Sequence, residues 1–392
     1  MTMTRRILLV LLFVLAAAGL LWWRQQARQP APAAAAALQP LAASEDLRGY
    51  ARATEPDAIR FPQDLGPHDD YQTEWWYYTG NLAADDGRAF GYQLTFFRRA
   101  LTPPPPAGES RPGDNPWRTN QVYLAHFTVS DVANEAFYPH ERFSRGAAGL
   151  AGAQAEPYHV WLEDWSATEV APGVVRLQAQ TADAAIDLTL TQTRPPVLHG
   201  QGGLSPKGPE PGNASYYYSL VQQTTSGTVR VGQEQLAVRG LSWKDHEYST
   251  SALSAGAIGW DWFSLQLDDG GALMLFQIRN EAGGLEPFSA GTYVAPDGRL
   301  TPLALGDWQL VVTDTWQSPE SGAVYPAGWQ LTIPALGLSL SGRPQMPNQE
   351  LNVSTVYWEG AVTFSGTIGD RPVTAQGYVE MTGYAHSMKG QI

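Results

Sequence analysis

Residues 243–247 place a tryptophan, a lysine, an aspartate, a histidine and a glutamate next to one another. We predict Asp245, His246 and Asp261 as the catalytic residues. An aspartate in an apolar pocket keeps its proton to an unusually high pH, so it can protonate an alkene, which needs a stronger acid than water. Aromatic rings can stabilise the resulting carbocation by about 0.5–2 kcal/mol each. These residue types therefore favour acid-catalysed addition of water to an alkene.

The predicted ligand-binding residues are mainly aromatic side chains, together with one histidine and one glutamate. They are Trp75, Tyr77, His126, Trp243, Glu247, Trp260 and Trp262. A structural interpretation competes with each of them. The tryptophans can pack in a core, His126 can be a hydrogen-bonded core histidine, and residues 243–247 can form a polar network that joins two domains.

The sequence predicts no metal site and no cofactor. Cysteine is absent, so thiolate metal sites, iron–sulfur clusters and disulfides are excluded. The sequence contains no His-Glu-x-x-His, no Gly-x-Ser-x-Gly and no Walker or Rossmann glycine pattern. The net charge is −13, and a chain this acidic is repelled by phosphate backbones, which argues against nucleic acid as a partner.

A β-strand over residues 241–248 would place alternate side chains on opposite faces. One face would carry Leu241, Trp243, Asp245 and Glu247, and the other Lys244, His246 and Tyr248. Because lysine prefers water, we expect the face with Asp245 to point inward.

The remaining elements also read as short strands. Turn signals follow one another at roughly ten-residue spacing between residues 121 and 243, which is typical of a sandwich or barrel. A tryptophan-rich strand, an Asp-Asp-Gly turn and an apolar strand ending in arginine occur over residues 75–98 and again over 260–279. This weak repeat predicts two related β-domains, residues 56–250 and 251–392.

The N-terminal segment is typical of export. Arg5 and Arg6 precede an apolar run over residues 7–23, so we predict a signal peptide or signal anchor over residues 1–24. Residues 25–55 form a Pro/Ala-rich linker. We therefore expect an exported protein, periplasmic, membrane-anchored or secreted, with the inner membrane as a partner through an N-terminal apolar helix.

Five motifs in order resemble the AttH-like and carotenoid hydratase-like (hydroxyneurosporene synthase) family. They are Glu74–Tyr77 with Thr79-Gly80, Gly240–Trp243 with Asp245–Glu247, Trp260–Leu267, Tyr357–Gly360, and Gly377–Tyr384. The resemblance implies an all-β fold of two lipocalin-like β-barrels or half-barrels packed side by side. Members named as hydratases add water to a terminal alkene of an acyclic carotenoid, whereas many other members have no established activity.

Three functions remain open on the sequence. The chain can bind an apolar lipid or isoprenoid in a β-barrel cavity, it can hydrate such a ligand, or it can be a structural subunit of an envelope complex, including an envelope transport complex. A buried acid facing a roomy aromatic pocket would favour the hydratase, whereas a filled interior would favour the structural subunit.

Overall fold

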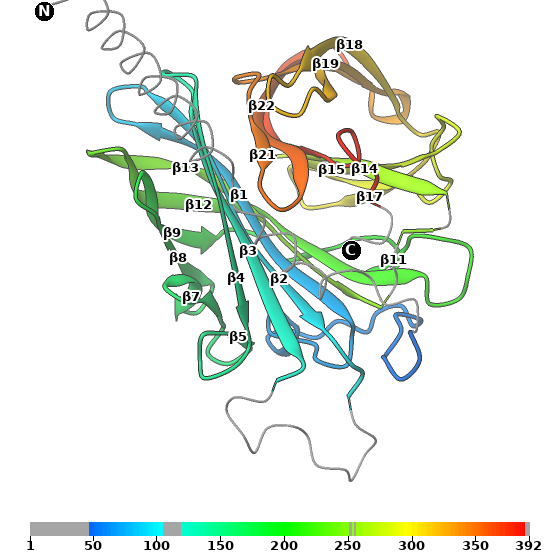
Figure 1. Ribbon diagram of the computed structural model, residues 1–392. Helices are drawn as coiled ribbons and strands as arrows, with labels where there is room; N and C mark the ends of the chain where they lie inside the picture. The colour runs from blue at the N-terminus through cyan, green and yellow to red at the C-terminus, as the bar shows by residue number, and fades with distance from the viewer. Residues whose placement is uncertain (1–46, 105–118, 251–252, 255, 389–392) are drawn as a thin grey trace, which may run out of the picture. The chain divides into compact units, whose positions relative to one another are not determined.

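The computed structural model describes residues 47–104, 119–250, 253–254 and 256–388, and nearly all of its regular structure is β-strand. The strands form two curled antiparallel sheets that lie side by side (Figure 1). This arrangement confirms the predicted all-β class with two barrel-like sheets. The predicted apolar helix within residues 1–24 lies outside the described residues.

The described residues contain two short 3₁₀ turns, Gln63–Leu65 and Pro334–Leu336. No helix in this part of the chain has the length and apolar character that a membrane crossing requires. The regular structure that positions side chains is therefore β-sheet.

The first sheet contains thirteen strands. In spatial order they are β4 (Ala136–Arg145), β3 (Gln121–Asp131), β2 (Ala89–Ala100), β1 (Thr73–Ala84), β13 (Glu234–Ser249), β12 (Ala214–Val231), β9 (Ala184–Gln192), β8 (Val174–Gln180), β7 (Trp165–Ala171), β6 (His159–Leu162) and β5 (Ala151–Gln154), while β10 (Val197–Leu198) and β11 (Leu204–Pro206) also pair with β12.

The second sheet contains ten strands. In spatial order they are β17 (Leu300–Ala304), β16 (Ala290–Val294), β15 (Ala272–Asn280), β14 (Ala257–Leu267), β23 (Arg371–Met381), β22 (Val356–Ile368), β20 (Leu338–Pro344), β19 (Val324–Ile333) and β18 (Gln309–Gln317), while β21 (Glu350–Asn352) also pairs with β22.

Each sheet curls around its own apolar core. In the first sheet, Phe127 of β3 and Val160 of β6 belong to one buried cluster although their strands lie near opposite ends of the sheet. In the second sheet, Leu303 of β17 and Trp329 of β19 share a core in the same way. Bulky buried side chains therefore lie in both interiors.

The repeated sequence pattern forms a pair of similar hairpins. β1 and β2 pair through one Asp-Asp-Gly turn, and β14 and β15 pair through the other. Gly87 and Gly270 have φ angles of 89° and 86°, values that strongly favour glycine, so both turns use their glycine in the same way. Each hairpin places a tryptophan-rich strand beside the other sheet.

A third apolar cluster joins the two sheets. It contains Tyr77, Tyr217 and Trp243 from the first sheet and Trp262 and Phe276 from the second. These side chains are large and apolar, so the outer faces of both sheets are buried against each other instead of facing water. The functional candidates of the sequence lie mainly at this junction.

Residues 47–55, which the sequence placed in the linker, pack on the first sheet. Tyr50 Oη donates a hydrogen bond to the carbonyl of Ala100 at 3.0 Å, and Ala53 is fully buried. Arg52 Nε donates to the carbonyl of Gly212 at 3.1 Å. The folded body therefore includes residues that a composition argument assigns to a spacer.

Candidate active site

A cavity of about 150 Å³ lies between the two sheets and is partly open to solvent. Its walls are mostly aromatic, with a few carboxyl groups and one lysine. The lining residues include Trp75, Tyr77, Phe97, Lys207, Tyr217, Asp245, Glu247, Trp260, Trp262, Phe276, Ile278, Tyr357 and Glu380. We expected a cavity inside a barrel, whereas this one is formed by the outer faces of the two barrels.

Strand alternation explains why pairs of residues two apart line this cavity. β1 contributes Trp75 and Tyr77, and β13 contributes Asp245 and Glu247. β14 contributes Trp260 and Trp262 in the same pattern. Since side chains of a strand point alternately to its two faces, each strand places only every second residue in the cavity.

Asp245 is the best-supported acid of the cavity. It is only 4% exposed and accepts three hydrogen bonds. Tyr217 Oη donates to Oδ2 at 2.6 Å, Trp243 Nε1 donates to Oδ1 at 2.6 Å, and Ser219 Oγ also donates to Oδ1. Burial raises the pKa of Asp245 to about 7, although the three donors oppose this shift. The group is therefore available as a proton donor near neutral pH.

A second layer of residues positions the donors to this carboxyl group. Trp262 Nε1 donates to Tyr217 Oη at 3.0 Å. His199 Nε2 lies 2.6 Å from Ser219 Oγ, and His199 Nδ1 lies 3.0 Å from Thr292 Oγ1. Burial lowers the pKa of His199 to about 3, so the ring is neutral and each nitrogen serves one hydroxyl. Both sheets thus hold the acid in place.

Glu247 differs from Asp245 because it has a cationic partner. Lys207 Nζ lies 3.1 Å from Glu247 Oε1, and Ser215 Oγ donates to the same oxygen. The ammonium of Lys207 also lies 4.1 Å from the centre of the Phe276 ring. Glu247 and Lys207 therefore form a charge pair in the wall of the cavity.

Two further glutamates belong to the second sheet. Glu380 lines the cavity, and Trp260 Nε1 donates to its Oε1 at 3.0 Å. Glu359 is fully buried behind it and accepts a hydrogen bond from Tyr77 Oη. Burial raises the pKa of Glu380 to about 7 and holds the pKa of Glu359 well above its usual range.

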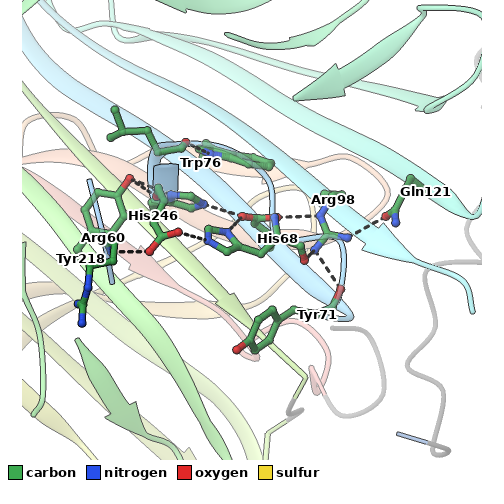
Figure 2. Close-up of polar contacts among 11 residues, drawn as sticks. Arg60, His68, Tyr71, Trp76, Arg98, Gln121, Tyr218 and His246 are labelled. Carbon is green, nitrogen blue, oxygen red and sulfur yellow. Dashed lines mark hydrogen bonds and ion pairs between the residues drawn. The ribbon is translucent and has the colours of Figure 1, made fainter. Parts of the chain in front are cut away.

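A separate polar cluster lies on the opposite face of β13 (Figure 2). His246 Nε2 and His68 Nδ1 lie 2.8 Å and 2.7 Å from the same oxygen, Glu74 Oε1. Arg98 Nε donates to Glu74 Oε2 at 2.8 Å, and both side chains of this pair are inaccessible to solvent. Burial works against the charge of Glu74, but Arg98 and His68 keep its pKa well below the usual range.

His68, Glu74 and His246 carry ligand atoms that lie within 4.8 Å of one another. Both imidazoles meet a single carboxylate oxygen at hydrogen-bond distance, and Arg98 takes the other oxygen. Burial lowers the pKa of His246 to about 4, so this ring is neutral and donates from Nε2. The contacts of the cluster form a closed hydrogen-bond network.

Lys244 lies on this same face and is buried, contrary to our expectation that it would point to water. It is 2% exposed, and its ammonium lies 4.3 Å from the centre of the Tyr158 ring. Burial lowers its pKa to about 7. The predicted alternation of β13 is correct. Over residues 242–249 both faces are buried, because one lies inside the first barrel and the other lies against the second sheet.

Six of the predicted residues line the cavity: Asp245, Glu247, Trp75, Tyr77, Trp260 and Trp262. Trp243 lies directly behind Asp245 as one of its hydrogen-bond donors. His126 Nδ1 lies 2.7 Å from the hydroxyl of Tyr357, so it supports the wall from behind.

Two predicted catalytic residues are not brought to the cavity. His246 points into the first barrel. Asp261 lies on the opposite face of β14 from the two neighbouring tryptophans, where Arg279 Nε donates to it at 3.1 Å and Tyr384 Oη at 3.0 Å. The structure therefore separates the three candidate acids and bases that the sequence grouped together.

The sequence interpretation missed Tyr217, Lys207, Tyr357 and the glutamates of the second sheet. Glu359 and Glu380 are each the only acidic residue of their strand, within segments that carried the family resemblance. A single acidic residue between buried neighbours is costly unless it is paired or protonated. This pattern is the sequence signal that could have identified both glutamates.

A family described as AttH-like matches residues 52–384. The kievitone hydratase of Fusarium solani subsp. phaseoli is 26% identical over 215 residues. That alignment covers 53% of this chain and 59% of the relative, so the chain spans less than two thirds of the relative's length.

Two solved structures are similar over most of the chain. An AttH-type protein from Nitrosomonas europaea is 33% identical with a TM-score of 0.75, covering 85% of this chain and 99% of that one. Kievitone hydratase from Nectria haematococca is 16% identical with a TM-score of 0.64, covering 86% and 97%. The second likeness bears on the fold alone.

Proposed function

The protein belongs to the AttH-like family, and from this premise we propose that it hydrates an alkene of an apolar ligand in the cavity between its two sheets. The observation that carries the proposal is Asp245, a buried carboxyl group that faces an aromatic cavity with its pKa raised to about 7 by burial. The kinship with kievitone hydratase supports the same reaction class.

The cavity supplies the groups that acid-catalysed hydration requires. Asp245 transfers its proton to one alkene carbon, and the three donors that surround it then stabilise the carboxylate that remains. The carbocation forms between aromatic faces, including Trp75, Tyr77 and Trp262.

The size of the cavity limits which part of a ligand reacts. A space of about 150 Å³ is comparable to an engineered apolar cavity that binds one benzene ring. The cavity therefore accepts one end of an isoprenoid, such as a terminal branched alkene, and its open side leaves room for the remaining chain. A long ligand would enter by its end.

The proposed place of action is outside the cytoplasm, with the globular part tethered or released after export. Arg5, Arg6 and the apolar run over residues 7–23 support this proposal. The apolar ligand would then be met at or near the inner membrane. No further protein partner is needed for the proposed reaction.

The experiment is a conversion assay with purified protein, using an acyclic carotenoid and kievitone as test substrates in detergent micelles. Chromatography and mass spectrometry should detect a product heavier by one water, and D245N should not form it. Asp131→Asn is the matched control, since Asp131 is a buried aspartate that accepts hydrogen bonds from Asn134 outside the cavity. Equal conversion by wild type and D245N would refute Asp245 as the acid.

A further inference from the structure

Glu359 and Glu380 form a carboxyl pair that the proposed proton donation by Asp245 does not use. They stand directly opposite each other on neighbouring antiparallel strands, β22 and β23. Side chains in such cross-strand positions lie on the same face and close together, and two like charges there repel each other. A glutamate pair at this position is stable only if its charge is reduced.

The hydrogen bonds of the pair show how the charge is reduced. Tyr77 Oη donates to Glu359 Oε1, and Trp260 Nε1 donates to Glu380 Oε1 at 3.0 Å. Glu359 Oε2 is buried and has no hydrogen-bond partner among the described residues. A single proton held between the two cross-strand carboxyl groups would give this oxygen the donor that it lacks and would remove one of the two like charges.

The pair faces the acid of the opposite sheet across the cavity. Glu380 lines the cavity from β23, whereas Asp245 lines it from β13. Both Asp245 and Glu247 act on Glu380 electrostatically and oppose its ionisation. One wall thus carries a carboxyl group that can give a proton, and the other wall carries a pair that can still take one.

We infer that Glu359 and Glu380 share a single proton and that this pair is the base which removes a proton from the attacking water. The inference rests on the proposed alkene hydration. It assigns the two proton transfers of that reaction to two different sheets, so that neither sheet alone would be competent.

The proposed reaction moves two protons between the cavity walls and the ligand. Asp245 gives its proton to one alkene carbon, a C–H bond forms from the π electrons, and the other carbon becomes a cation. Water then forms a C–O bond to the cation, and one of its protons passes to Glu380 as the O–H bond breaks. Asp245 is left ionised and the pair carries two protons. Solvent at the open side of the cavity returns one proton from the pair to Asp245.

The first test of the inference needs no substrate. Infrared spectroscopy at neutral pH should show an absorption of a protonated carboxyl group that disappears in both E359Q and E380Q and persists in D245N. Glu350→Gln is the matched control, because Glu350 is buried in the second barrel and accepts hydrogen bonds from Ser318, Ser321 and Tyr325 instead of a carboxyl group. The shared proton is refuted if neither E359Q nor E380Q changes the absorption.

The second test separates the base from the acid. In heavy water, E380Q should still exchange deuterium into recovered alkene, because Asp245 still protonates it, while formation of the alcohol falls by about 10²–10⁴-fold. D245N should lose both reactions. If E380Q does not fold, E359Q is measured instead, since its amide can donate to Glu380 and make it a weaker base, so that alcohol formation should fall while deuterium exchange persists. Alcohol formation by E380Q at the wild-type rate would refute the base.

A wild-type protein that neither exchanges nor hydrates any test alkene would refute the proposed function. In that case the assignment of the glutamate pair as the base would also be refuted. The infrared measurement would still decide whether the pair shares a proton. The two failures are therefore distinguishable.

Discussion

Replacing Asp245 with asparagine removes the acidic proton but keeps the size and shape of the side chain. Without that proton the alkene is not protonated, and we expect the hydration rate to fall by about 10²–10⁴-fold, the usual contribution of a general acid. Ligand uptake should persist, because the aromatic walls of the cavity are unchanged.

The effect of D245N on stability follows from the donors around the carboxyl group. The amide oxygen can accept the hydrogen bonds of Trp243 and Ser219, which both reach Oδ1. The amide nitrogen cannot accept the hydrogen bond of Tyr217 Oη, which reaches Oδ2. One buried hydroxyl therefore loses its acceptor, at a cost of about 1–3 kcal/mol at low pH.

This cost should change with pH in a known direction. Burial raises the pKa of Asp245 from 3.8 to about 7, so the folded protein binds this proton more tightly than the unfolded chain. The resulting stabilisation is complete below about pH 4 and is lost as the pH rises to about 7, on the order of 4 kcal/mol in total. Asparagine does not titrate, so D245N does not lose this stabilisation. The stability of D245N relative to wild type should therefore increase as the pH rises.

Urea unfolding of both proteins at about pH 4.5 and about pH 8 measures this difference. We expect D245N to be the less stable protein at the lower pH and at least as stable at the higher pH. A stability difference that stays constant between the two pH values would refute a raised pKa at Asp245, and with it the reason for choosing this residue as the acid.

The pH profile, the buried cluster around Glu74, metal dependence and export can each be tested separately. The hydration rate of wild type should fall about tenfold per pH unit above about pH 7, as Asp245 loses its proton, and a flat pH profile would contradict this. Glu74→Gln should cost about 3–5 kcal/mol in urea unfolding, since Arg98 is left as an unpaired buried charge, whereas E234Q at an exposed ion pair should have little effect. A chelator should leave the thermal midpoint unchanged, and a midpoint lowered by chelator and restored by zinc would show that the Glu74 cluster binds metal. Residues 1–45 fused to a reporter should carry it out of the cytoplasm, and reporter activity confined to the cytoplasm would contradict export.

The placement of Asp245 and Glu247 on one face was predictable, because alternation is a property of the backbone of every strand. Which face is the inside was not predictable from β13 alone. That question depends on a second sheet that covers the face with Asp245 and on a barrel that encloses Lys244. The alternation within β13 determines which side chains share a face, whereas tertiary packing determines what surrounds each face.

The position of Asp261 outside the cavity could have been predicted from the sequence. It lies between Trp260 and Trp262, and adjacent residues of a strand face opposite ways. If the two tryptophans line the cavity, the aspartate cannot, and its partners are instead Arg279 and Tyr384.

The pair of glutamates could not have been found from either strand by itself. Glu359 and Glu380 are 21 residues apart in sequence and become neighbours only through the register of β22 and β23. Register is the hydrogen-bonded alignment of the two strands. Shifting one strand by two residues leaves the same side chains on the same face, so the pattern of apolar residues alone does not determine the register.

The most direct test of the central claim is hydration in isotopically labelled water with an acyclic carotenoid or kievitone as substrate. We expect a product that carries the labelled oxygen on one former alkene carbon and a solvent-derived hydrogen on the other, formed by wild type and D131N but not by D245N. Formation of the same labelled product by D245N at the wild-type rate would contradict the claim that Asp245 protonates the alkene.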